Sequence, residues 1–235
     1  MNNRIYLDHA ATTDMLPEVA YAMEPYFIKK YGNASATYEL GAEARRAIEL
    51  ARERISASIH AKPSEIYFTS GGTESDNWAI KGMAGERKKE AKHIITSKIE
   101  HHAVLHSCEY LERLGYQVSY LDVDEDGIVR IPQLEEVMRE AGKSSFIQDK
   151  VSLVSVMYGN NEIGTLQPIE EIGALARRYH IPFHTIVPIL FPMNTTSSYS
   201  AKSTPASISS ACRSAIKKDS SIRFRSPFTF GGKPL

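Results

Sequence analysis

The stretch T-S-G-G-T-E-S-D-N-W-A-I-K, Thr69–Lys81, directly follows an apolar run, Ile66–Phe68, and contains two adjacent glycines. This order predicts a strand, a tight turn and a helix that begins near Glu74. The first N–H groups of such a helix have no intrahelical partner and favour a phosphate or carboxylate. Gly71 and Gly72 permit close approach of an anion, and Thr73 adds a hydroxyl donor. The same residues also suit a simple turn with a helix cap, so both interpretations stand at this point.

Strand-like and helix-like segments alternate on both sides of this turn. Expected strands are Glu65–Thr69, His93–Ser97, Gln117–Leu121, Val151–Met157 and Ile181–His184. Expected helices are Pro17–Lys29, Glu39–His60, Glu74–Lys89, Ala103–Leu114, Pro132–Glu140 and Pro168–Tyr179. The alternation predicts an α/β domain with a mostly parallel central sheet flanked by helices.

Polar groups follow three of the expected strands. They are Gly71-Gly72-Thr73, Glu100-His101-His102 and Asn160-Asn161-Glu162. Because parallel strands end at one edge, where α/β proteins bind ligands, we expect the three groups to converge there. An imidazole at His101 is able to stack on a flat ring or to move protons, although a cap or surface role is the commoner one. The Asn160 amide suits a substrate oxygen or ring hydroxyl, and equally suits a turn.

The histidines at positions 102 and 106 are spaced four apart with Glu109 nearby, as two metal ligands on one helix face would be. No other ligands are spaced to complete the coordination shell. The sequence therefore predicts no metal site.

Composition excludes several classes of protein. The 28 basic and 28 acidic residues cancel, and 42% of the 235 residues are hydrophobic, which supports a globular core without a field for nucleic acid or acidic membranes. The start lacks a signal peptide's apolar core, and no window approaches a membrane span, so we expect a cytoplasmic protein. Cys108 and Cys212 lie far apart, which indicates reduced thiols.

The character of the chain changes at Ile186. The last fifty residues carry eleven serines against thirteen in the preceding 185, and seven basic residues against one acidic residue, Asp219. Helical and strand periodicity also end there. Ser- and Pro-rich sequence of this kind buries little apolar surface, so the sequence predicts a disordered or poorly packed tail over 186–235 that is not a domain.

Five stretches, one of them containing the Gly-Gly turn, together resemble one enzyme family. They are Y-L-D-H-A-A-T-T (Tyr6–Thr13), Y-G-N-A-S-A-T-Y (Tyr31–Tyr38), S-E-I-Y-F-T-S-G-G-T-E-S-D-N (Ser64–Asn77), I-E-H-H-A-V-L (Ile99–Leu105) and N-N-E-I-G-T-L-Q-P-I (Asn160–Ile169). In this order they resemble the cysteine desulfurases, pyridoxal-phosphate (PLP) enzymes of the class V aminotransferase group with fold type I. The resemblance runs from about residue 4 to Thr185.

The resemblance implies a fold and an activity. Residues 1–185 would be the N-terminal part and an incomplete large PLP-binding domain. The family removes sulfur from L-cysteine, leaving alanine and an enzyme persulfide for iron–sulfur cluster or thiolated-cofactor synthesis. Family members are homodimers that pass sulfur to acceptor or scaffold proteins. Selenocysteine lyase is another class V activity that the parent could have had.

The resemblance also implies roles for individual residues. Gly72 and Thr73 match the loop that holds the PLP phosphate, and His101 matches the histidine that stacks on the cofactor ring and assists proton transfer. Asn160 matches an asparagine near the ring hydroxyl and the substrate carboxylate. Ala11 and Thr12 match an N-terminal loop close to the substrate.

The family pattern fails where the composition changes. Ile186 stands where the family has the aspartate that keeps the pyridine nitrogen protonated. The family's Ser-Gly-His-Lys segment, whose lysine forms the Schiff base, has no counterpart, so covalent PLP attachment is not expected. Neither cysteine matches the family's persulfide cysteine, and Cys108 is expected to be buried within a helix.

These departures lead to a hypothesis and two alternatives. Residues 1–185 would be the front portion of a cysteine desulfurase whose remainder was replaced by a frameshift or a misjoined reading frame, leaving a poorly soluble and inactive chain. A short paralogue that binds PLP without covalent attachment, or that binds a full-length subunit, is the first alternative. A basic tail that contacts nucleic acid is the second, but its basic residues are scattered, so no nucleic-acid partner is predicted.

Overall fold

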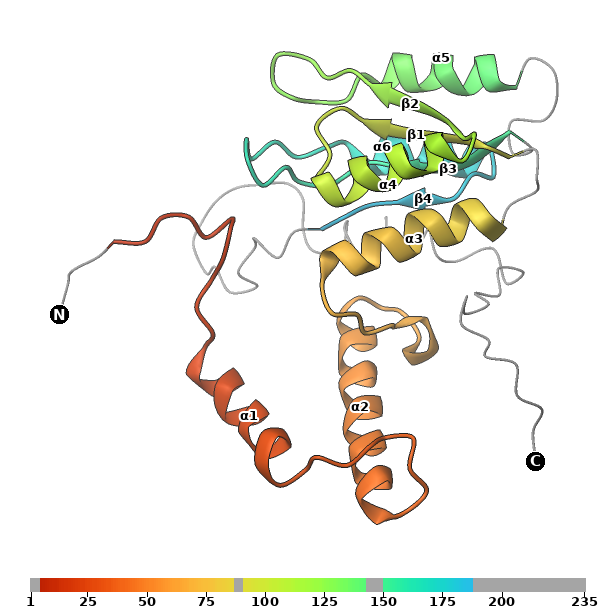
Figure 1. Ribbon diagram of the computed structural model, residues 1–235. Coiled ribbons are helices and arrows are strands. Elements are labelled where there is room, and N and C mark those ends of the chain that lie inside the picture. Colours follow the sequence, from red (N-terminus) through yellow and green to blue (C-terminus); the bar gives the residue numbers. More distant parts are fainter. Residues whose placement is uncertain (1–4, 87–90, 143–149, 188–235) are drawn as a thin grey trace, which may run out of the picture.

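A computed structural model of the protein describes residues 5–86, 91–142 and 150–187 (Figure 1). Four parallel strands form its sheet: β1 (His93–Ser97), β2 (Gln117–Leu121), β3 (Val151–Ser155) and β4 (Phe183–His184). Their order is β2-β1-β3-β4, and every pairing is parallel. The predicted parallel α/β sheet is confirmed.

Helices cover both faces of this sheet. They are α3 (Gly72–Glu86), α4 (His102–Arg113), α5 (Ile131–Ala141) and α6 (Ile169–Arg178). Successive side chains of a strand point to opposite faces, so Ile94 packs with α3 and α4 while Ile95 packs with α5 and α6. Such crossover helices account for strands that are buried on both faces, as β1 and β3 are along their whole length.

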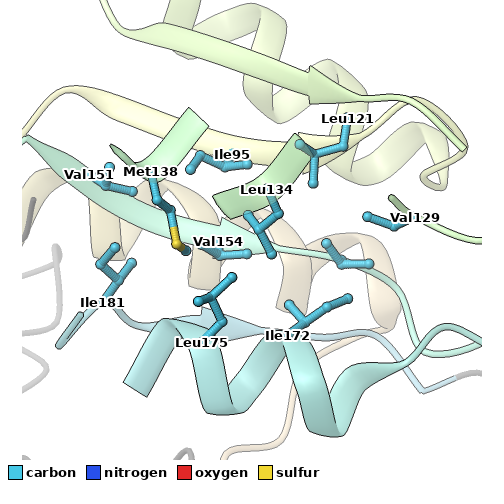
Figure 2. Close-up of a cluster of buried hydrophobic side chains, with 11 residues drawn as sticks. Ile95, Leu121, Val129, Leu134, Met138, Val151, Val154, Ile172, Leu175 and Ile181 are labelled. Atoms are coloured by element: carbon cyan, nitrogen blue, oxygen red, sulfur yellow. The ribbon is translucent and has the colours of Figure 1, made fainter. Parts of the chain in front are cut away.

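The larger core cluster lies between the sheet and the helices α5 and α6 (Figure 2). Leu134 and Met138 project from α5, and Ile172 and Leu175 from α6, toward Val154 of β3. The spacings of four and three residues place each pair on one face of its helix. The apolar periodicity of these two segments therefore determines which faces pack on the sheet.

One predicted strand is wrong. The segment Glu65–Thr69 begins in a short 3-10 helix, η1 (Pro63–Glu65), and continues as extended chain without a ladder partner among the described residues. Tyr67 and Phe68 are 55% and 50% exposed. The Arg52 guanidinium donates a hydrogen bond to the Ile66 carbonyl and lies over the Phe68 ring. An extended segment forms sheet only when another strand takes its backbone hydrogen bonds, and here no described strand does so.

The strands His93–Ser97 and Gln117–Leu121 have their predicted bounds, and the other described boundaries differ from the predicted ones by a few residues. The helix α3 begins at Gly72, two residues before the predicted start, so both members of the Gly-Gly pair sit at its first turn. The predicted end of this helix, at Lys89, falls outside the described residues.

The N-terminal part forms two helices, α1 (Pro17–Ile28) and α2 (Glu39–Ser58), which lie away from the sheet (Figure 1). No residue of α1 is buried, and its large apolar side chains include Tyr21 and Phe27, each 73% exposed. A soluble domain rarely exposes so much apolar surface on one short segment.

The predicted tail, 186–235, lies outside the described residues except for Ile186 and Val187. Within the described part of the chain, no helix has the length and hydrophobicity that crossing a bilayer requires.

Candidate active site

The first candidate group is the amino end of α3, at the carboxyl edge of the sheet (Figure 1). A Cβ atom added to Gly71 or Gly72 would have no heavy atom within 4 Å, so the space beside this helix start is free of protein atoms. Thr73 is exposed here, and the first amides of the helix lack intrahelical acceptors. The geometry fits a phosphate group held by backbone N–H groups and a hydroxyl.

The loop before α3 is held in shape by its own side chains. The Glu74 carboxylate accepts hydrogen bonds from the Ser70 N–H and hydroxyl, each at 2.6 Å, and these bonds lower the pKa of Glu74. The hydroxyls of Thr69 and Ser75 lie 2.6 Å apart. The turn is therefore ordered before any anion arrives, with an ionised carboxylate nearby.

His101 caps the amino end of α4. Its Nδ1 accepts a hydrogen bond of 3.1 Å from the Ala103 N–H, so the neutral ring carries its proton on Nε2. The ring is exposed at the same sheet edge, and it lies within electrostatic range of Asp76 on α3. Both the cap role and a face available to a ligand are thus present in one residue.

Asn160 joins two loops at this edge. Its Nδ2 donates to the Ile99 carbonyl at 2.9 Å, and its Oδ1 accepts from the N–H groups of Glu162 and Ile163 at 2.8 and 3.1 Å. The side chain is 8% exposed. These bonds match the turn-forming interpretation. A contact between Asn160 and a cofactor or substrate stays a prediction, because the side chain would have to give up one of these hydrogen bonds to make it.

The N-terminal loop with Ala11 and Thr12 is fully exposed. Its backbone N–H groups both point to the Asp8 carbonyl, at 3.1 and 3.4 Å, and the Thr12 hydroxyl lies 3.2 Å from that of Tyr6. All these bonds stay within residues 6–12. The proximity of this loop to a substrate therefore stays a prediction.

A row of buried polar side chains below α3 escaped the sequence reasoning. The Ser155 hydroxyl lies 2.9 Å from Nδ1 of His184, whose Nε2 lies 3.6 Å from an oxygen of Asp76. Thr96, paired in register with Ser155, points to the same face, and its hydroxyl is buried without a partner in the described structure. Burial raises the pKa of Asp76 to about 6 and lowers that of His184 to about 4, so His184 is neutral at pH 7 and Asp76 ionises less readily than an exposed aspartate.

The sequence held a partial signal for this row. Thr96, Ser155 and His184 lie at or next to the carboxyl ends of their strands. Asp76 interrupts the buried face of α3, whose other buried members are Ile80, Met83 and Ala84. Only the strand register, however, shows that they meet.

The remaining candidates are accounted for by packing. Cys108 is fully buried as a free thiol, as predicted, and burial raises its pKa to about 12, which makes it a poor nucleophile. The rings of His102 and His106 stack, with centroids 5.5 Å apart. Among residues 5–86, 91–142 and 150–187 there is no group of three or more His, Cys, Asp or Glu side chains able to hold a metal ion. Cys212 lies outside those ranges.

A glycine-bearing helix start, a capping histidine and a buried asparagine thus meet at the edge of one parallel sheet. A family model described as aminotransferase class-V matches residues 5–185 of the chain. The chain belongs to the class-V aminotransferases. Members of this family depend on PLP, whose phosphate suits the helix start described above.

Relatives of this class-V chain bear the name cysteine desulfurase IscS. The protein from Clostridium botulinum is 48% identical over 185 residues, which cover 79% of this chain and 44% of the relative. The protein from Methanosarcina thermophila is 50% identical over 184 residues, which cover 78% of this chain and 43% of the relative. The chain thus spans less than half the length of the curated relatives that it matches.

Solved structures agree with this assignment. A NifS-like protein superposes with a TM-score of 0.70 at 37% identity, over 78% of this chain and 49% of the other. A structure described as SspA in complex with cysteine gives a TM-score of 0.69 at 42% identity, over 77% and 49%. The predicted fold, an incomplete PLP-transferase large domain, and the family resemblance are both confirmed.

Proposed function

We propose that this chain is the cofactor-binding front portion of a cysteine desulfurase and that it binds PLP without covalent attachment. The observation that carries the proposal is the amino end of α3, where two glycines leave space free of protein atoms beside unpaired amides and the Thr73 hydroxyl. His101, at the same edge and electrostatically coupled to α3, is the residue to stack on the ring. When bound, PLP supplies an electron sink for bond breaking at the α-carbon of a substrate.

Different residues of the chain would bind different parts of the cofactor. The α3 amides and Thr73 hold the phosphate, and His101 presents its ring face and its Nε2–H to the cofactor side of the edge. Asn160 keeps the two ligand-bearing loops together through the Ile99 carbonyl.

Desulfuration of L-cysteine, the family substrate, should not occur in this chain by itself. Ile186 packs as an apolar side chain against the cluster around Ile80 and Val104, at the position where the resemblance places an aspartate. The lysines after Thr185, Lys202, Lys217, Lys218 and Lys233, lie in no segment that resembles the family's lysine motif. Without those groups the cofactor is neither anchored covalently nor held in its protonated form.

Partners follow from the same proposal. The exposed apolar surface of α1 suits a second subunit, as in a homodimer, or the part of the fold that the relatives carry beyond the matched half. Sulfur acceptors and a cytoplasmic location belong to the parent enzyme in this proposal. They are separate from PLP binding and need separate tests.

The experiment is a PLP titration of the full chain, followed by absorbance and by quenching of Trp78 fluorescence. Saturable binding that weakens roughly tenfold in Thr73→Val and His101→Ala would support the proposal, since each change removes one contact of ordinary strength. Borohydride treatment should attach PLP to no single lysine in stoichiometric amount, because only chance Schiff bases with exposed amines are available for reduction. Failure to bind, or binding unchanged in both variants, would overturn it. Release of alanine from L-cysteine would overturn the statement on activity.

The origin of the tail has its own test. Resequencing the coding DNA from the codons for His180 onward, and translating it in three frames, should restore an aspartate after His-Thr and a downstream Ser-Gly-His-Lys. If no frame restores them, the tail is the protein's own, and the short-paralogue alternative replaces the disrupted desulfurase.

A further inference from the structure

Glu100 lies in the loop after β1, directly before His101, and reaches the loop after β3 that carries Asn160. Its side chain is 6% exposed, and Oε1 accepts two hydrogen bonds: from the Ser97 hydroxyl at 2.7 Å and from the Met157 N–H at 2.9 Å. Ser97 ends β1, and Met157 follows β3 by two residues. One carboxyl oxygen therefore ties the ends of two neighbouring strands together.

A second bond closes the connection. Asn160 donates from Nδ2 to the carbonyl of Ile99, the residue before Glu100. The loop after β1 and the loop after β3 are thus joined at two points. Glu100 of the first loop accepts from Met157, and Asn160 of the second loop donates to Ile99. Because His101 is the next residue after Glu100, its place at the sheet edge depends on these two bonds.

The other oxygen of the carboxyl, Oε2, is buried and has no hydrogen-bond partner in the described structure. The pKa of Glu100 is raised to about 7, mainly by burial and in smaller part by Asp76 on the facing helix α3, against the hydrogen bonds from Met157 and Ser97, which lower it. From α4 the nearby titratable group is the Cys108 thiol, which is neutral at this pH. A buried carboxylate with one oxygen unpaired is costly, whereas the protonated form keeps Oε1 as the acceptor and removes the charge.

We propose that Glu100 is a positioning residue for the cofactor site, which in its neutral form clamps the loop that carries His101 to the loop that carries Asn160. The proposal rests on the proposed PLP binding for its functional part. Its structural part, the clamp, stands on the hydrogen bonds alone. Glu100 itself makes no contact with the phosphate-binding helix start.

The test compares Glu100→Gln, which keeps the acceptor in a permanently neutral group, with Glu100→Ala, which removes it. Two quantities are measured on the full chain: hydrogen exchange of the Met157 amide without ligand, and the PLP dissociation constant from pH 6.5 to 8.5. Glu100→Ala should accelerate exchange at Met157 and weaken PLP binding, each roughly tenfold, because the Met157 N–H is left unpaired. Glu100→Gln should match the wild type at pH 6.5.

The pH dependence of the PLP dissociation constant distinguishes a positioning role of Glu100 from a general effect on the stability of the fold. Wild-type affinity should fall more steeply above pH 7 than that of Glu100→Gln, since only the wild type ionises at this position. PLP itself also titrates in this pH range, but it does so equally for the wild type and Glu100→Gln, so the difference between the two proteins does not depend on it. Leu134→Ala, in the distant α5 core, serves as the matched destabilised control and should leave PLP affinity unchanged.

Several results would overturn the proposal. These are unchanged Met157 exchange in Glu100→Ala, an equal loss of PLP affinity in Leu134→Ala, or identical pH profiles for wild type and Glu100→Gln. If Glu100→Ala does not fold, Glu100→Asp, which withdraws the acceptor by one methylene, takes its place with the same expectations. If the wild type binds no PLP, the proposed function fails, and the Met157 exchange alone decides whether the clamp exists.

Discussion

Nε2 of His184 lies 3.6 Å from Oδ1 of Asp76, which joins the edge strand β4 to the first turns of α3. Both side chains are largely buried, and burial drives each toward its neutral form, so the contact is not an ordinary ion pair. Asp76 is the only buried residue in the first two turns of α3. The contact therefore holds the glycine-bearing helix start over the sheet edge.

The burial of these two side chains makes the stability of the chain depend on pH in two opposite ways. The pKa of Asp76 is raised from 3.8 to about 6 in the folded state, so its contribution is present below pH 4 and is lost as the pH rises through 6. The pKa of His184 is lowered from 6.5 to about 4, so its contribution is present above pH 6.5 and is lost as the pH falls toward 4.

Asp76→Asn removes the first of these effects. Between pH 5 and pH 8 the free energy of unfolding should therefore rise by about 1 kcal/mol more in Asp76→Asn than in the wild type. Urea unfolding at the two pH values, followed by circular dichroism, measures the difference. An equal change in both proteins would show that Asp76 keeps an ordinary pKa in the folded chain.

Gly72→Ala should separate folding from anion binding. The added methyl group meets no protein atom within 4 Å, so the free energy of unfolding should change by less than about 0.5 kcal/mol. The same methyl occupies space beside the first amides of α3, so PLP should bind several-fold more weakly. Gly85→Ala, on the same helix and equally free of neighbours, is the matched control and should bind PLP as the wild type does.

Cys108 should be unreactive in the folded chain. It is fully buried, and its pKa of about 12 leaves almost no thiolate at pH 8. In a Cys212→Ser background, a thiol-specific disulfide reagent should label no cysteine at pH 8 and one cysteine in denaturant. Rapid labelling without denaturant would show that α4 opens or packs differently.

The exposed apolar surface of α1 should make the chain self-associate. Phe27→Glu places a charge on a side chain that is 73% exposed, so it should increase the soluble fraction and reduce light scattering without a measurable loss of stability. Leu114→Asp, at an exposed position beyond the end of α4, is the control and should change scattering less. Equal effects would mean that no particular surface drives association.

Much of the fold was predictable because local pattern and tertiary packing agree. The strand Gln117–Leu121 has its predicted bounds, and the apolar spacing within α5 and α6 matches the faces that pack on the sheet. The family resemblance was predictable for a similar reason, since short motifs at sheet ends carry the groups that bind ligands. The segment Glu65–Thr69 failed because its composition favours a strand, whereas forming one requires a neighbouring strand that the described chain does not provide.

The sequence by itself determined the alternating layers, the glycine-bearing helix start and the point at which the family pattern ends. It could not determine which buried polar groups meet. Asp76 and His184 are more than a hundred residues apart, and the bond from Met157 to Glu100 spans 57 residues. Those contacts depend on strand order and register, which set the distances between side chains, and on burial, which sets their charge. Tertiary structure alone therefore decided which residues hold the site together.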